Sequence, residues 1–369
     1  MQLSQLTLLN FRNYQTADIS FSNGVHIIHG ENGAGKTSIL EAIYYLALTK
    51  SFRTTVDKHI ILNQEKMFRI QGEFISNQGQ KIQTAIAYSA DSGKQLTVNK
   101  QKAQKFSEYI GEIPLVLLYP SDLNISQGGP QQRRRFLDIL LSQSSKLYLH
   151  HLIQYNRSLR QRNQLLQQPD CDPQLLVSWE ENLITHGIEL ILKRRETAAA
   201  LSALTKQFYQ DLSSKDDKVK IVYQCNVFKD ETEELAEKYR QAFERKRLKE
   251  IEYGTSLIGP HRDDLLFLIN GHPMRVFASQ GEHKTFVIAL KLSEFSYLQQ
   301  QRSHSPIMLF DDIFGELDAN RIQQMLGQLS DIGQVFVTTT SRNFFDKVQR
   351  FDAPVQYYEV ANGGVAASA

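Results

Sequence analysis

The sequence has 369 residues, which is enough for a large hydrophobic core and for two lobes. Hydrophobic residues make up 41% and charged residues 22%, values that exclude a disordered chain and are typical of a globular protein. The net charge of +2 does not indicate a nucleic-acid-binding protein by itself, so any such surface would have to come from local basic clusters.

Signals for a membrane or an oxidising compartment are weak. No apolar stretch approaches the roughly 18 residues of a membrane span. The first five residues have no basic region ahead of an apolar run, which argues against a signal peptide. Cys171 and Cys225 are too few for a disulfide framework and lack metal-ligand spacing. We therefore expect a cytoplasmic protein that does not enter a membrane.

The N-terminal third predicts strands around a single helix. Alternating apolar residues over 3–29 indicate a strand meander that ends in a buried run. A glycine-rich turn at 30–37 follows, and apolar residues then recur with helical spacing from Ile39 to Ala47. Short alternating segments within 67–98 predict antiparallel strands, and 113–119 predicts a buried strand that Pro120 ends.

Helical periodicity governs the middle of the chain. It extends from Pro130 to about Leu212, and the stretch 169–173 divides it into two helical arms. Residues 219–225 alternate as a strand. Asp230 with Glu233 resembles a capped start for a helix over 231–250.

Strands return towards the C-terminus. Asn270-Gly271 predicts a hairpin turn, with a return strand through Met274 and Val276. We expect helices over 282–300 and 319–329, buried strands over 307–310 and 335–339, and a frayed small-residue tail after Gly363.

These elements predict two lobes of different class. Strands alternate with helices at both ends of the chain, so one α/β head is expected to use both termini, with a mostly helical insertion between them. We place the head in residues 1–125 and 255–369 and the helical lobe in residues 126–254.

One motif in the head predicts nucleotide binding. The loop comprises Gly30, Glu31, Asn32, Gly33, Ala34, Gly35, Lys36 and Thr37. This matches a P-loop between a strand and a helix, where backbone N–H groups and the helix N-terminus face the phosphates. Lys36 is expected to reach the β- and γ-phosphates of ATP, and the Thr37 hydroxyl to ligate Mg²⁺.

An acidic pair after a buried strand supplies the second part of such a site. Asp311 and Asp312 follow the apolar run 307–310, with Glu316-Leu317-Asp318 just beyond. We expect Asp311 to hold Mg²⁺ through water and Asp312 to orient the attacking water. An ordinary strand with an acidic turn is the alternative interpretation of this segment alone.

A third segment separates classes of P-loop protein. Ser279, Gln280, Gly281 and Glu282 open a helix shortly before the acidic strand, where ATPases of the ABC type carry their signature loop. A hydroxyl and backbone N–H groups at a helix N-terminus form an anion site. Ser279 and Glu282 also suffice for a plain capping box, which is the structural alternative.

The whole series of motifs resembles that of the RecF family. The matching segments are Phe11-Arg12-Asn13-Tyr14, the P-loop, Pro120-Ser121-Asp122-Leu123, Gly129-Pro130, Arg133 to Asp138, Gly259 to Asp264, Ser279 to Glu282 and Asp311 to Asp318. They occur in family order and cover nearly the whole chain.

The resemblance implies an ATPase head of the ABC type, similar to those of SMC proteins but without their long coiled coil. It also implies ATP-dependent dimerisation on DNA, with Ser279 acting on the partner's nucleotide, slow hydrolysis, and partnership with RecO and RecR. The family's task is to help load RecA at single-strand gaps bounded by duplex DNA. By position, Arg12 is a candidate phosphate contact.

Two departures from the general ABC pattern favour a switch over a fast motor. Asp312 stands where many ABC ATPases have glutamate, and Thr338-Thr339-Thr340 follows the last strand where many have a switch histidine. A shorter carboxylate holds water less favourably.

Contact with DNA is predicted only from clusters of basic residues. Arg133, Arg134 and Arg135 open a helix, and further basic residues follow in the helical lobe. Phosphate binding needs several such contacts, whereas charge runs usually only solvate a helix face. The arginine run could equally serve a dimer or nucleotide interface.

Three other functions compete with this interpretation. The helical insertion and the divergent signature loop argue against a transporter ATPase subunit. A P-loop kinase would not need Ser279 to Glu282. A purely structural protein would not bind nucleotide.

Overall fold

The structure is a computed structural model with two compact units. One unit comprises residues 1–122 and 291–369, and the other comprises residues 123–290. The structure describes residues 1–169, 173–213, 215–228, 234–302, 304–313, 333–340, 354–361 and 363–368.

The first unit contains a largely parallel sheet with the order β15-β14-β3-β13-β12-β8. Its strands are β3 (Gly24–His29), β8 (Leu115–Leu118), β12 (Ile307–Asp311), β13 (Gln334–Thr339), β14 (Val355–Ala361) and β15 (Gly364–Ser368). Every residue of β8, β12 and β13 is buried, as expected for parallel strands covered on both faces. The register sets Asp311 beside Thr338 and Thr338 beside Ile28, so the carboxyl ends of three strands meet at one edge.

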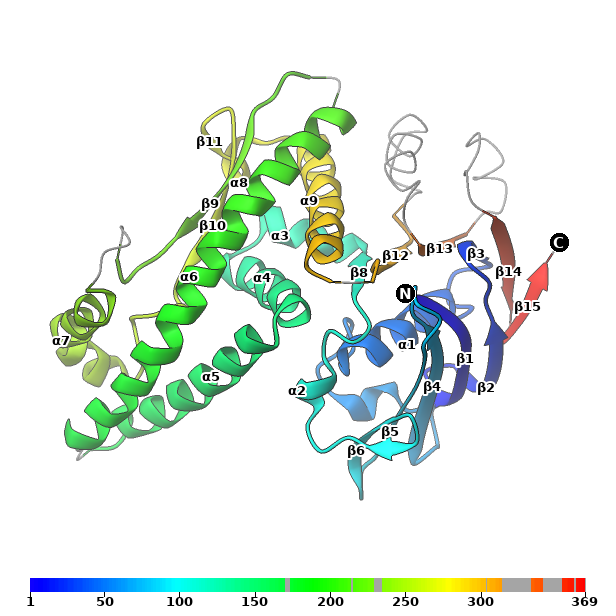
Figure 1. Cartoon of the computed structure of the whole chain (residues 1–369), viewed down its shortest axis with the longest axis horizontal. Coiled ribbons are helices and arrows are strands. Elements are labelled where there is room, and N and C mark those ends of the chain that lie inside the picture. Colours follow the sequence, from blue (N-terminus) through cyan, green and yellow to red (C-terminus); the bar gives the residue numbers. More distant parts are fainter. Residues whose placement is uncertain are drawn as a thin grey trace. The chain divides into compact units, whose positions relative to one another are not determined.

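A second, antiparallel sheet of this unit has the order β2-β1-β4-β5-β6-β7. Its strands are β1 (Gln2–Phe11), β2 (Tyr14–Ser20), β4 (Met67–Ile75), β5 (Lys81–Ser89), β6 (Gly93–Val98) and β7 (Gln101–Lys102). Helix α1 (Lys36–Leu48) contacts strands of both sheets and is almost entirely buried (Figure 1). The unit also contains the short helices η1 (Asp57–Ile60), α2 (Phe106–Tyr109) and η2 (Pro120–Asp122).

The second unit is mostly helical. Its helices are α3 (Leu123–Gln127), α4 (Pro130–Ser144), α5 (Lys146–Leu166), α6 (Pro173–Leu212), α7 (Leu235–Tyr253) and α8 (Met274–Phe277). Helix α9 (Gln280–Gln301) begins in this unit and continues into the first. A small antiparallel sheet has the order β11-β10-β9, from β9 (Val219–Gln224), β10 (Asp264–Ile269) and β11 (His272–Pro273). Helices α5 and α6 pack against each other, and α6 continues well beyond α5 (Figure 1).

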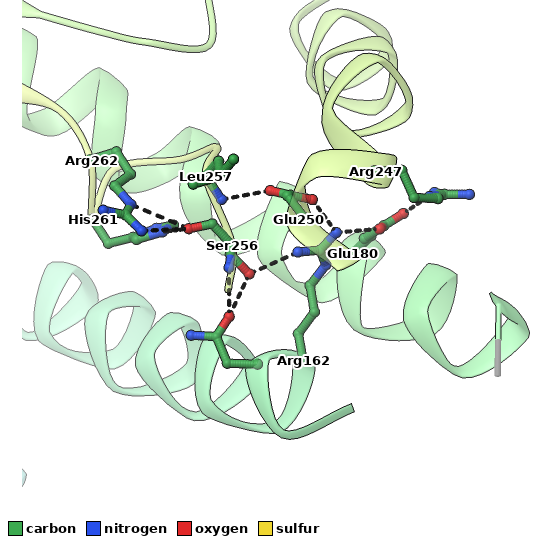
Figure 2. Close-up of polar contacts among 9 residues, drawn as sticks. Arg162, Glu180, Arg247, Glu250, Ser256, Leu257, His261 and Arg262 are labelled. Atoms are coloured by element: carbon green, nitrogen blue, oxygen red, sulfur yellow. Dashed lines mark hydrogen bonds and ion pairs between the residues drawn. The ribbon is translucent and has the colours of Figure 1, made fainter. Parts of the chain in front are cut away.

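A buried ionic network joins three helices of the second unit to the loop after α7. Arg162 of α5 is fully buried and binds Glu180 of α6 at 2.7 Å and Glu250 of α7 at 2.6 Å (Figure 2). Its second terminal nitrogen donates to the Ser256 hydroxyl at 2.7 Å. Arg247 donates to the other oxygen of Glu180 at 2.6 Å. The network thus matches each buried carboxylate with a cation, as buried charges require.

The segment Gly259 to Asp264 is a second polar hub of this unit. Asp264 receives a bidentate pair from Arg133, at 2.8 and 2.9 Å. Asp263 accepts from the Asn226 N–H at 2.8 Å, and its backbone carbonyl accepts from Arg134 at 2.6 Å. His261 contacts the Tyr155 hydroxyl at 2.7 Å. The segment therefore ties α4 and α5 to the end of β9.

Two sequence predictions are wrong at the C-terminal side. Residues after Gly363 do not fray, because β15 pairs with β14 from Gly364 to Ser368. The hairpin at Asn270-Gly271 forms, but its return strand is only His272–Pro273 and the chain then turns into α8 over Met274–Phe277.

The division into units also differs from the expected boundaries. Residues 255–290 lie in the second unit, whereas the sequence pattern predicts them in the head. The reason is strand pairing over long sequence distance, because β10 pairs with β9 from Asp264 opposite Gln224 to Ile269 opposite Val219. The predicted helix over 319–329, the predicted cap at Asp230 and Glu233, Glu316 to Asp318 and Cys171 lie outside the described residues.

Candidate nucleotide-binding site

The predicted P-loop connects β3 to α1 in the first unit. Gly35 has φ of 120°, a conformation that side chains other than glycine's disfavour. A Cβ at Gly35 would also lie 2.5 Å from Asn13 Nδ2 and 2.7 Å from the Tyr14 hydroxyl. Asn13 and Tyr14 hold the loop in turn, donating to the Ala34 carbonyl at 2.8 Å and the Gly35 carbonyl at 3.1 Å. The family-like segment after β1 therefore supports the loop.

Lys36 folds back over this loop. Its Nζ donates to the Gly30 and Glu31 carbonyls, each at 2.8 Å, and only 7% of the residue is exposed. Burial lowers the pKa of Lys36, against the opposing charges of Asp312 and Asp311. The ammonium is therefore fixed at the mouth of the loop, where a phosphate oxygen can replace a carbonyl partner.

Thr37 and Asp311 come together although 274 residues separate them. The Thr37 hydroxyl donates to Asp311 Oδ1 at 2.8 Å, and the Thr338 hydroxyl donates to the same oxygen, also at 2.8 Å. Burial raises the pKa of Asp311, while the two hydroxyl donors act in the opposite direction. A hydroxyl and a carboxylate at this spacing are the hard oxygen donors that Mg²⁺ prefers, so the residues present fit that ion.

Asp312 follows in the left-handed region, with φ of 50°, and its side chain is exposed. Its N–H donates to the Thr338 hydroxyl at 3.0 Å. Thr338 therefore fixes both members of the acidic pair, through the side chain of Asp311 and the backbone of Asp312. Sequence reasoning noted Thr338 only as standing where other ATPases have a histidine; its alignment opposite Asp311 is a result of strand pairing.

Arg12 lies against α1. Its guanidinium pairs with both oxygens of Glu41, at 2.8 and 2.6 Å, and donates to the His59 carbonyl at 2.7 Å. Glu41 is fully buried and also accepts from Ser51 and, at 3.4 Å, from Arg53. Arg12 thus supports the P-loop helix through Glu41, and its contact with phosphate stays a prediction.

Arg53, which no sequence pattern singles out, lies near enough to Asp311 to act on its charge. Its side chain is 45% exposed, and one nitrogen contacts buried Glu41. Its charge opposes the rise that burial causes in the pKa of Asp311. A lone arginine in a polar loop after a helix carries no pattern of its own. The only available signal was its position directly behind the P-loop helix.

Ser279 stands just before α9 in the second unit. Its N–H and hydroxyl donate to Glu282 Oε2 at 2.8 and 2.9 Å, and its hydroxyl accepts from the Glu282 N–H at 3.3 Å. These bonds, together with Lys215 at 2.9 Å, lower the pKa of Glu282 to about 2. The capping box is therefore formed. Ser279 and Gln280 remain exposed, and no atom lies within 4 Å of a Cβ built at Gly281, so the backbone there is open to approach.

Two of the three consecutive arginines of α4 make contacts inside the protein. Arg133 is buried in its pair with Asp264, and Arg134 donates to the Asp263 carbonyl. Of the three, only Arg135 is exposed. The prediction that Arg133 contacts DNA therefore does not hold in this structure. Releasing its guanidinium would leave Asp264 without its bidentate partner. Two further basic residues of the second unit, Arg162 and Arg194, are also buried. They pair with Glu250 and Asp138.

Fold and site together define an ATPase head of the ABC and SMC class, with a P-loop, an acidic strand end and a capped signature-like helix. Residues 2–363 match the family described as the RecF/RecN/SMC N terminal domain. No helix in the described part of the chain has both the length and the apolarity to cross a membrane.

Proteins that are similar to this chain over nearly its full length identify the family within this class. A protein of Chloroherpeton thalassium named DNA replication and repair protein RecF is 38% identical, covering 95% of this chain and 98% of that protein. The protein of the same name from Halalkalibacterium halodurans is 38% identical and covers 99% of both. The chain belongs to the RecF family.

Solved structures of RecF superpose closely on this chain. The recombination mediator RecF in complexes described as RecF-ATPrS and RecF-ATP superposes with a TM-score of 0.91 at 30% identity, covering 100% of this chain. An SMC head bound to the C-winged helix domain of ScpA superposes with a TM-score of 0.58 at 14% identity, which shows the fold alone.

Proposed function

We propose that the chain is an ATP-dependent, DNA-binding recombination mediator that acts in DNA repair and replication restart. Membership of the RecF family supports this, as does the ATP named for the related structures. The observation that carries the proposal is the meeting of Thr37, Asp311 and Thr338 beside the P-loop, since hydroxyls from two separate segments donate to one oxygen of Asp311.

The chemistry of the site is phosphate and metal binding. Lys36 would contact the β- and γ-phosphates, and Thr37 and Asp311 would hold Mg²⁺, whose charge offsets that of the phosphates. Asp312 would orient water for hydrolysis. An aspartate in that place and a threonine in place of a switch histidine suit slow, DNA-stimulated hydrolysis that works as a switch.

Dimerisation is the proposed consequence of ATP binding. The exposed Ser279 and the open backbone at Gly281 would contact the γ-phosphate held by a second copy. The ATP-bound dimer would bind DNA at junctions of single strand and duplex and, with RecO and RecR, help load RecA at gaps.

Sedimentation with ATP, ADP and duplex DNA tests the dimer. We expect ATP alone of the two nucleotides to shift the chain to a dimer, and Ser279→Arg to prevent this while leaving ATP affinity of the monomer nearly intact. Ser178→Arg, at an exposed position of α6, is the control. Mixing Ser279→Arg with Lys36→Ala protein should restore part of the ATPase activity, because one intact composite site can form. Normal dimerisation of Ser279→Arg would leave the capping box as the only role of Ser279.

DNA binding is tested by comparing neighbouring arginines. Arg135→Ala should weaken binding uniformly across sequences and reduce the log–log salt slope by about 0.9, the value for one phosphate contact. Arg133→Ala should instead destabilise the fold. An unchanged slope in Arg135→Ala would remove the α4 run from the DNA surface.

A further inference from the structure

Three of the ten histidines of the chain gather on the α5–α6 pair. His150 and His151 are consecutive in α5, and His186 lies in α6. The ring centroids of His151 and His186 are 5.2 Å apart, and those from His150 to the other two are 5.6 and 6.1 Å. The Nδ1 atoms of His151 and His186 are 2.9 Å apart. None of the three takes part in the nucleotide site.

The packing of the two helices sets this distance. On α5, Tyr148 and Tyr155 lie three residues before and four residues after His151 on the same face, and both are buried. On α6, Gly187 leaves room for aromatic side chains of α7 and α5, since a Cβ there would lie 2.9 Å from Tyr239 and 3.2 Å from the Tyr155 ring. His151 and His186 therefore face each other in a tightly packed seam, yet both are only half-buried and solvent ions can reach them.

The pair favours neutral imidazoles. Burial lowers the pKa of His151, opposed by the charge of Glu189 and helped by His150. Burial also lowers the pKa of His186, helped by His151 and His150. Two facing Nδ1 atoms can share only one proton in a hydrogen bond. Neutral imidazole is the form that binds metal ions, through the lone pair of an unprotonated ring nitrogen.

We propose that His151 and His186 bind one divalent transition-metal ion such as Zn²⁺ through their Nδ1 atoms, linking α5 to α6. Zinc–nitrogen distances of about 2.0–2.1 Å place two ligand nitrogens about 2.9–3.4 Å apart at angles of about 90–110°. The 2.9 Å separation of the two Nδ1 atoms lies at the lower end of this range, and an ion would turn both rings so that their lone pairs point to it instead of at each other.

Water completes the coordination. The described residues offer no group of three or more His, Cys, Asp or Glu side chains arranged around one ion, so two protein ligands define the site. Glu189 adds negative charge beside it. Imidazole ligands select Zn²⁺, Ni²⁺ or Cu²⁺, whereas Mg²⁺ prefers oxygen, so the ion of the nucleotide site does not compete.

Calorimetric titration of Zn²⁺ into the tag-free full chain, without nucleotide, tests the site. We expect one ion per chain with micromolar affinity. His151→Asn and His186→Asn, which keep a polar group in the seam, should each weaken binding at least about tenfold, equivalent to about 1.4 kcal/mol. His150→Asn is the matched control and should bind within about threefold of the wild type.

Thermal unfolding gives a second readout that does not depend on activity. Zn²⁺ should raise Tm of the wild type and of His150→Asn, because an ion that binds only the folded chain stabilises it, and should leave Tm of His151→Asn unchanged. Circular dichroism confirms that each variant is folded. Absence of stoichiometric binding by the wild type, or equal binding by His151→Asn, would overturn the proposal, as would an equal loss in His150→Asn.

Discussion

The two units of this chain differ in what their charged side chains contact. In the first unit, Lys36, Thr37 and Asp311 lie at a strand edge beside a glycine loop, in hydrogen bonds that a phosphate or Mg²⁺ would replace in the proposed site. In the second unit, Arg133 and Arg162 are buried in direct contact with carboxylates of the fold. Similar residue types thus form a ligand site in one unit and internal supports in the other.

The two kinds of site differ in how much of their structure a local motif specifies. A P-loop specifies backbone conformation, spacing and the flanking elements at once, so the sequence alone is enough to assign its residues. A run of arginines specifies none of these. Whether a cation meets solvent or a buried carboxylate depends on which helix faces which, and Arg135 differs from Arg133 only in its position around α4.

Changing the proposed water-orienting carboxylate should have the largest effect. Asp312→Asn keeps the shape but removes the base, so we expect ATP hydrolysis to fall about 10²- to 10⁴-fold with ATP affinity retained. A steady-state phosphate-release assay measures the first and nucleotide titration the second. Asp91→Asn, in an exposed loop of the same unit, should hydrolyse normally. A wild-type rate in Asp312→Asn would exclude it from hydrolysis.

Removing the central cation of the second unit tests the other side of the comparison. Arg162→Met should lower the free energy of unfolding by about 3–5 kcal/mol, because Glu180 and Glu250 lose a buried partner. Urea unfolding followed by circular dichroism measures this loss. The exposed Arg160→Met, half a turn earlier, should change it by less than about 0.5 kcal/mol. Equal stabilities of the two variants would refute a supporting role for Arg162.

The P-loop lysine should affect ligand binding and not stability. Lys36→Ala loses a charge-assisted contact to phosphate, about 1.5–3 kcal/mol of ATP binding free energy. Fluorescence titration with an ATP analogue measures the change, and Lys50→Ala, exposed just after α1, is the control. Unchanged affinity would show that Lys36 serves only the loop carbonyls it contacts here.

A pH effect is expected at the Gly259 to Asp264 hub. Burial lowers the pKa of His261 from 6.5 to about 4, so between these values the unfolded chain carries a proton that the folded chain does not. Stability from this histidine is complete above pH 6.5 and declines as pH falls towards 4, by up to about 1.4 kcal/mol per unit. His261→Asn should reduce the dependence of the free energy of unfolding on pH between 6.5 and 4, measured by urea unfolding at several pH values. A parallel decline in both proteins would assign the effect elsewhere.

Local sequence patterns are sufficient to predict the strand–loop–helix of the P-loop, the acidic strand end and the helices within residues 130–169 and 173–212, because periodicity and glycine spacing are local properties. Contacts between distant segments are what bring Thr338 to Asp311 and Arg12 to Glu41, pair residues 364–368 as a strand and place residues 255–290 in the helical unit. Each depends on pairing between segments far apart in the chain, and no local pattern specifies the partner of an edge strand or of a buried charge.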